Sequence, residues 1–171
     1  MKNKTSLIIT LKIDDASQTF FNEKRKQYYP AYANFVDAHI TLFHKLPFDK
    51  EMLYHTLKQM SNTNIFDMQV VGIKNIENFV AYDIASPKLQ NIHASMQATF
   101  TNMLNEKDKE TLWPHITMHN KATEYKAFKT HEKLLEDFKP FSITAVGFTT
   151  WLYAKKEWIK KEDFLFELNG G

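Results

Sequence analysis

Two short segments place a histidine and a threonine two positions apart, His39-Ile40-Thr41 and His115-Ile116-Thr117. An imidazole has a pKa of about 6.5, so near neutral pH one histidine can accept a proton while another donates one. A threonine hydroxyl can donate a hydrogen bond to a phosphate oxygen. Two such pairs facing each other would suit the cleavage of a phosphodiester. One histidine would take a proton from water or a ribose hydroxyl, and the other would protonate the departing oxygen.

The surroundings of the two motifs are also alike, because a lysine follows six residues after each histidine. The β-branched isoleucine and threonine of each motif favour strands, and Pro114 fits the first residue of a strand. Side chains alternate between the two faces of a strand. Each strand therefore presents one row: His39, Thr41, Phe43 and Lys45 in the first, and His115, Thr117, His119 and Lys121 in the second. By the same alternation, His44 points away from the first row.

Several residues near the motifs are candidates for substrate binding. Lysine ammonium groups can pair with phosphate, and aromatic rings can stack on bases or line the mouth of a cleft. The candidates are Phe43, Lys45, His119, Lys121, Tyr29, Trp151 and Tyr153. Each has an ordinary alternative, which is core packing for a ring and a solvated strand end for a lysine. From pattern alone, the two motifs themselves also fit ordinary half-buried strand residues.

Metal binding is a weaker interpretation of the same histidines. The spacing of His115 and His119 would suit zinc on a helix, but on a strand the two lie roughly 13 Å apart at about 3.3 Å per residue. The chain has no cysteine, which excludes thiolate zinc sites, disulfides and a cysteine nucleophile. We therefore expect no metal and no other cofactor. A metallohydrolase remains an alternative that a chelator would test.

The rest of the chain alternates strand and helix patterns. The predicted strands are 6–13, 38–46, 66–76, 79–85, 114–121, 141–154 and 158–168. The predicted helices are 16–27, 50–60, 87–104 and 124–138, with Ser86 as a possible N-cap and 105–111 as a charged loop. This order predicts an α+β fold with a mainly antiparallel sheet. The repeated strand-helix unit around each motif suggests two lobes related by pseudo-symmetry.

The two motifs and their flanks resemble the 2H phosphoesterase superfamily, which includes 2'-5' RNA ligases and cyclic phosphodiesterases. Bacterial members of the 2'-5' RNA ligase family are similar over Tyr28-Tyr29-Pro30, residues 38–47, residues 113–121 and Thr150-Trp151-Leu152-Tyr153. The resemblance implies one bilobal domain over residues 1–171, with a central cleft and helices on the outside. It also implies that the catalytic set is His39, Thr41, His115 and Thr117. The implied substrates are RNA ends, 2',3'-cyclic phosphates or 2'-5' linkages.

Net charge and the lengths of the apolar runs limit the partners and the location that we expect for this protein. The formal net charge is +2, which is too small to predict a nucleic-acid coat by itself. The first apolar run is too short for a signal peptide, and no stretch approaches the roughly 20 apolar residues of a membrane span. We therefore expect a cytoplasmic monomer that binds an RNA end or a small nucleotide and needs no obligate protein partner. A catalytically inactive nucleotide- or RNA-binding module on the same fold is the main alternative.

Overall fold

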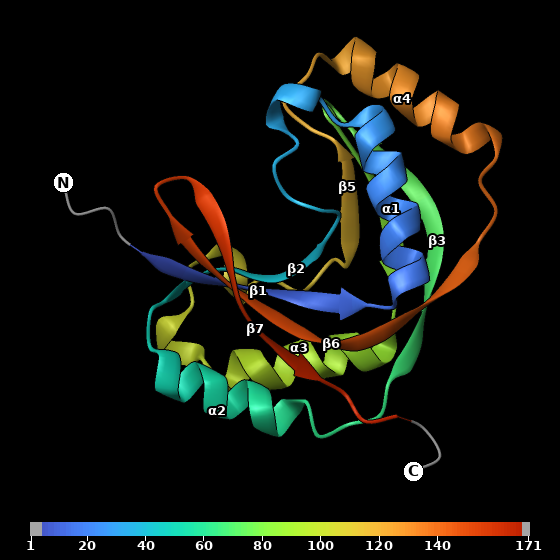
Figure 1. Cartoon of the computed structure of the whole chain (residues 1–171). Coiled ribbons are helices and arrows are strands. Elements are labelled where there is room, and N and C mark those ends of the chain that lie inside the picture. Colours follow the sequence, from blue (N-terminus) through green and yellow to red (C-terminus); the bar gives the residue numbers. More distant parts are fainter. Residues whose placement is uncertain (1–4, 169–171) are drawn as a thin grey trace.

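The computed structural model describes residues 5–168 (Figure 1). The strands are β1 (Ser6–Ile13), β2 (Ile40–Pro47), β3 (Phe66–Ile76), β4 (Phe79–Ala85), β5 (His115–His119), β6 (Phe141–Ala154) and β7 (Glu157–Leu165). The helices are α1 (Asp15–Tyr28), α2 (Lys50–Met60), α3 (Pro87–Thr99) and α4 (Glu124–Glu136). None of these helices has the length and hydropathy that a membrane crossing requires.

One sheet contains all seven strands, in the order β2-β1-β6-β3-β4-β5, with β7 paired to β6. Every pairing between these strands is antiparallel. The long strand β6 joins two halves of the sheet. Its first residues, 141–145, pair with β3, whereas 147–154 pair with β7 and 145–153 pair with β1. The first half therefore holds β2, β1, β6 and β7, and the second holds β6, β3, β4 and β5.

Gly147 lies where β6 passes from one half to the other. A Cβ atom at this position would come 2.6 Å from the backbone oxygen of Phe164 on β7. Such a contact is too short for any other residue, so a glycine is required where the last residue of β7 pairs with β6. The register between β6 and β1 also shifts beside this glycine.

The helices cross between the halves (Figure 1). Helix α1 follows β1 of the first half but packs against β5 of the second, where α4 covers β3 and β4. Helix α3 follows β4 of the second half but packs with α2 beneath the first half, where His93 contacts the carbonyl of Leu42 on β2. This exchange ties the lobes together, and the predicted α+β fold with a mainly antiparallel sheet is confirmed.

Most predicted elements are confirmed within one or two residues of their ends. The hydroxyl oxygen of Ser86 accepts a hydrogen bond from the backbone N–H of Leu89, as expected of an N-cap followed by a proline. The exceptions are the predicted helix 87–104, which ends at Thr99 and continues as a short 3-10 turn, and the predicted strand 158–168, which ends at Leu165. His39 lies just before β2, and the charged loop contains another 3-10 turn at Lys107–Lys109.

Candidate active site

A shift in strand register follows the first His-x-Thr motif. Thr41 on β2 lies opposite Thr10, but Phe43 lies opposite Ile9, so two steps along β2 match one step along β1. Such a bulge changes the face on which the next side chain lies. Phe43 is fully buried, and its ring stacks on His93 with centroids 4.6 Å apart. Phe43 therefore packs in the core and is not free to stack on a base, contrary to the sequence prediction.

The second motif is followed by the same shift. Thr117 on β5 lies opposite Ala81, and His119 lies opposite Val80. His119 is 5% exposed, and its Nδ1 atom lies 3.2 Å from the hydroxyl of Thr130 on α4. The predicted substrate contact of His119 is therefore wrong, because the side chain packs under α4. His115 and His119 do not form the zinc pair that their spacing would suit on a helix.

The register shift in β2 also corrects the prediction for His44. This exposed side chain lines the same pocket as Thr41 and His115, rather than pointing away from them. Asp108 holds His44 in this position. Its carboxylate accepts a 2.9 Å hydrogen bond from the His44 backbone N–H and a 3.1 Å hydrogen bond from the Lys45 backbone N–H. The same carboxylate lies 3.2 Å from His44 Nδ1. Burial acts to raise the pKa of Asp108, but these hydrogen bonds outweigh it and the pKa is lowered.

Both motif histidines are oriented by a backbone carbonyl two residues earlier. His39 Nδ1 lies 2.7 Å from the oxygen of Asp37, and His115 Nδ1 lies 2.7 Å from the oxygen of Trp113. A carbonyl oxygen can only accept a hydrogen bond, so each neutral ring carries its proton on Nδ1. Each Nε2 atom is then left with a lone pair for a substrate.

The surroundings lower the pKa of both histidines. Burial in the cleft, with the charges of Arg25, His115 and His44 acting in the same direction, lowers the pKa of His39 to about 4. Burial also lowers the pKa of His115, although the charge of Asp83 acts to raise it. Both rings are therefore neutral at pH 7 in the free protein.

An aromatic ring packs against each of these histidines. The ring centroids of His39 and Trp158 are 4.9 Å apart, and those of His115 and Trp113 are 4.1 Å apart. The Trp113 indole donates a 2.8 Å hydrogen bond to the carboxylate of Asp83, which fixes its plane. On the other side, Trp158 makes an edge contact with Trp151 at 5.9 Å. Both imidazoles are thus held between a backbone carbonyl and a rigid ring.

A cavity of about 320 Å³ lies beside the motifs and brings the two halves together. Thr41 of β2 and His115 of β5 both line it, and strands β2 and β5 are in contact. His44, Lys107 and Trp113 add polar and aromatic surface to its walls. His39 and Thr117, the other two motif residues, are not among the residues that line it.

Three polar residues on one face of α1 join the two motifs. Gln18 donates a 2.8 Å hydrogen bond to the Ala38 carbonyl, and Asn22 accepts one of 2.9 Å from the Ala38 N–H, directly before His39. Arg25, one helical turn further on, donates a 2.9 Å hydrogen bond to the carbonyl of Thr117. A single helix therefore holds the backbone of both motifs.

Arg25 is almost fully enclosed, with 5% of its surface exposed. Its Nε atom also donates to the side-chain oxygen of Asn34, in the segment that leads to His39. The guanidinium lies 3.9 Å from the centroid of the Tyr29 ring, and Tyr29 is buried beneath it. Tyr29 therefore packs against Arg25. The sequence had suggested instead that Tyr29 lines the mouth of a cleft.

The family comparison agrees with this geometry. A family model described as the 2'-5' RNA ligase superfamily matches residues 13–157. The chain belongs to this superfamily. The match covers most of the chain and includes both His-x-Thr motifs, so the protein is a 2H phosphoesterase-type enzyme. A search of curated proteins found no match.

Solved structures of low sequence identity share the fold of this 2H phosphoesterase. TT0787 of Thermus thermophilus is 12% identical, with a TM-score of 0.65 over 96% of this chain and 99% of that one. E. coli LigT in complex with NADP+ is 12% identical, with a TM-score of 0.60 over 95% of this chain and 98% of that one. LigT in complex with 3'-AMP gives 12% and 0.59 over the same shares. At this identity the likeness establishes the fold alone.

The remaining residues predicted to contact substrate in this 2H phosphoesterase differ in how far they are exposed. Trp151 is half-buried and its indole donates a 2.9 Å hydrogen bond to the Thr10 hydroxyl, while Tyr153 is half-buried opposite Trp158. Lys45 is exposed near the end of β2, and Lys121 is exposed in the turn after β5, with a backbone φ of 61°. Their contacts with a phosphate stay predictions.

Sequence reasoning missed the residues that support the histidines. Trp113 stands two positions before His115, so its adjacency was a usable signal. Trp158 reaches His39 only through the pairing of β6 with β7, which no local pattern reveals. Arg25 was also missed, because a buried arginine on an otherwise polar helix face has the sequence pattern of a solvated one.

Proposed function

We propose that this enzyme acts on RNA ends, hydrolysing 2',3'-cyclic phosphates or 2'-5' phosphodiester linkages by metal-independent catalysis with His39 and His115. The observation that carries the proposal is the matched orientation of the two rings. In both, a carbonyl occupies Nδ1 and leaves Nε2 for proton transfer. General acid-base catalysis needs two such groups on opposite sides of one reacting phosphate.

The pKa values favour His39 as the base. It is the more strongly shifted ring and remains neutral far below pH 7, whereas the charge of Asp83 favours a proton on His115. An incoming phosphate anion further favours the protonated form of a nearby imidazole. His115 would therefore enter the reaction as the acid, with protons on both ring nitrogens.

In the hydrolysis of a cyclic phosphate, His39 Nε2 takes a proton from water as the water oxygen bonds to phosphorus. The bond from phosphorus to one ribose oxygen breaks, and His115 Nε2 protonates that oxygen. The products are a phosphomonoester and a ribose hydroxyl. Thr41 and Thr117 would donate hydrogen bonds to the non-bridging oxygens, where negative charge develops. The same positions, with the proton transfers reversed, would serve ligation.

Two observations support this substrate class: the aromatic residues near His39, and the nucleotides bound to a protein of the same fold. Half-buried Trp151 and Trp158 provide aromatic surface beside His39, which suits a base. LigT, which shares the fold, has been solved with the nucleotides 3'-AMP and NADP+. Both observations support a nucleotide or RNA end as the substrate of this chain.

The test is turnover of a 2',3'-cyclic nucleotide and a 2'-5'-linked dinucleotide in the presence of EDTA. His39→Ala and His115→Ala should each lower kcat by about 100- to 10,000-fold. His55→Ala, which removes an exposed imidazole on α2, serves as the matched control and should retain full activity. Full activity of either motif variant would refute two-histidine catalysis. Loss of wild-type turnover in EDTA would instead support the metallohydrolase.

A further inference from the structure

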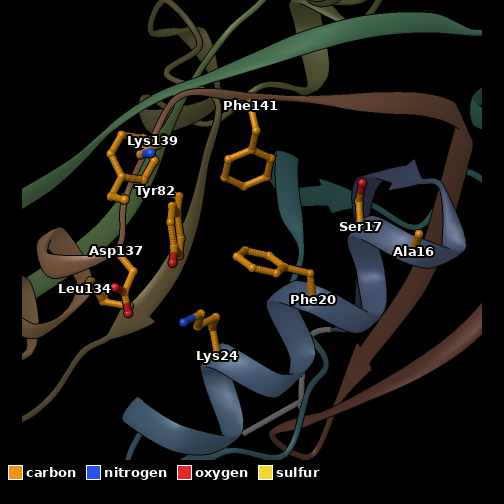
Figure 2. Close-up of a pocket in the computed structure, with 10 residues that line it drawn as sticks. Ala16, Ser17, Phe20, Lys24, Tyr82, Leu134, Asp137, Lys139 and Phe141 are labelled. Atoms are coloured by element: carbon orange, nitrogen blue, oxygen red, sulfur yellow. The ribbon is translucent and has the colours of Figure 1, made fainter.

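A second cavity lies on the opposite face of the second half of the sheet. Its volume is about 420 Å³, and it opens between α1 and the connection from α4 to β6 (Figure 2). None of its lining residues lines the cavity beside His115. Tyr82 on β4 forms part of its wall, whereas the next residue, Asp83, accepts a hydrogen bond from Trp113, which lines the cavity beside His115. The two cavities therefore lie on opposite sides of β4.

The walls of this cavity are aromatic. Phe20 on α1 makes edge contacts with Phe141 at 5.3 Å and with Tyr82 at 6.3 Å between ring centroids, and Phe138 lies 6.2 Å from Tyr82. Phe20 is 39% exposed, so apolar surface remains open to solvent inside the cavity. Covering such surface is favourable by about 25 cal/mol per Å². An apolar ligand that covers this surface could make edge or offset contacts with the aromatic rings.

One end of the cavity is polar (Figure 2). Tyr82 is 2% exposed, and its side chain lines the cavity. Burial raises the pKa of Tyr82 to about 12, so the hydroxyl keeps its proton. Figure 2 shows this hydroxyl directed toward the end where the Lys24 ammonium and the Asp137 carboxylate lie. A phenol that keeps its proton can donate a hydrogen bond to an anion that enters the cavity.

The charges at the rim identify the kind of acceptor. Lys24 and Lys139 both line the cavity, and Asp137 is the acidic residue among its lining residues. Neither lysine forms a salt bridge within the described part of the chain. The rim therefore has an excess of positive charge, which favours an anion over a cation.

We propose that this cavity binds a small aromatic carboxylate. The ring system would lie against the exposed surface of Phe20, and the carboxylate would accept hydrogen bonds from the Tyr82 hydroxyl and the lysine ammonium groups. A cavity of this volume is within the usual range for small-molecule sites. The site is independent of the proposed catalysis, since no residue is shared.

The test is calorimetric titration of the wild-type protein with 2-naphthoate, beside the neutral analogue 2-naphthalenemethanol. Saturable binding of naphthoate is expected, and the double variant Lys24→Gln/Lys139→Gln should weaken it by about tenfold or more. The same variant should leave binding of the neutral analogue nearly unchanged. Tyr82→Phe should weaken naphthoate binding without altering the aromatic walls. No saturable naphthoate binding at millimolar concentration would overturn the proposal.

Two further variants separate this site from the catalytic cleft. Ser17→Trp should fill the cavity and abolish naphthoate binding, and circular dichroism would check that the variant folds. His39→Ala should bind naphthoate as the wild type does, whatever its activity. Displacement of naphthoate by inorganic phosphate, or equal binding by Ser17→Trp in folded form, would place the ligand elsewhere and refute the proposal. If Ser17→Trp does not fold, the lysine variant decides.

Discussion

The two halves of the sheet hold their histidines by the same local devices but in different electrostatic surroundings. Each ring has a carbonyl two residues earlier, an indole beside it and a register shift after the following threonine. His39, however, has only cationic groups among the charges that act on it, whereas His115 also has Asp83. Pseudo-symmetry thus places two similar rings, and the unlike charges around them favour one as base and the other as acid.

Among the residues that support the two histidines, the largest effect should come from removing the Arg25 contacts by which α1 joins the halves. Arg25→Met removes the donors to the Thr117 carbonyl and to Asn34, so the two motifs should move relative to each other. A displacement of about 1 Å can cost about 100-fold in rate, and we expect kcat to fall by about tenfold to 100-fold. Steady-state kinetics would measure it, and KM should change much less than kcat.

Arg25→Lys is the conservative comparison for this variant. It keeps the charge but lacks the planar fork that reaches two acceptors, so it should restore only part of kcat. Arg25→Met should also lower the free energy of unfolding by about 1–3 kcal/mol, because a buried carbonyl and amide oxygen lose their partner. If stability falls and kcat is unchanged, Arg25 stabilises the fold and does not position the motifs.

A smaller effect should follow from removing an anchor that only the first half has. Asp108 ties the charged loop to the end of β2, and the structure gives β5 no matching carboxylate among residues 5–168. Asp108→Asn replaces charge-assisted hydrogen bonds by neutral ones, which should lower the free energy of unfolding by about 1–3 kcal/mol at pH 7. Urea unfolding would measure this difference.

The contribution of Asp108 to the free energy of unfolding should depend on pH. The pKa of Asp108 is lower in the folded protein than its ordinary value of 3.8. Its stabilisation is therefore present above pH 3.8 and is lost as pH falls through the folded-state pKa. Wild type and Asp108→Asn should differ at pH 7 and converge in strong acid. Equal unfolding free energies at pH 7 would contradict the anchor.

The smallest effects should come from the rings beside the histidines. An aromatic pair contributes about 0.5–1.5 kcal/mol, so Trp158→Leu should lower kcat by no more than about tenfold. Trp113→Leu is the matched variant in the other half, and it should cost more because the hydrogen bond to Asp83 is lost as well. A larger loss from Trp158→Leu than from Trp113→Leu would reverse the expected order.

The repeated motif was enough to propose His39 and His115 as a pair, whereas the sequence did not predict on which face of each strand the residues beyond the motif lie. Strict alternation failed at Phe43 and His119, since a register shift follows each threonine. In β2 the adjacent apolar pair Leu42 and Phe43 offered a signal, because alternation would expose one of them. In β5 the pair Met118 and His119 fits regular alternation, so the sequence held no warning.

Long-range contacts explain the remaining misses. Gln18, Asn22 and Arg25 follow the spacing of a helix face, and polar residues at such a spacing usually face water. Here that face meets the backbone of both motifs, because α1 crosses to the opposite half of the sheet. The crossing depends on how β6 joins the halves, and no local pattern in α1 reports it.

Titration of the histidine rings by ¹⁵N-edited NMR in the free protein tests the central claim most directly. The account predicts that His39 and His115 are both Nδ1-protonated when neutral, that His39 titrates with a midpoint of about 4, and that His115 titrates above it but below the ordinary 6.5. A His39 midpoint near 6.5, a midpoint above that of His115, or an Nε2-protonated neutral ring would contradict the proposed roles of base and acid.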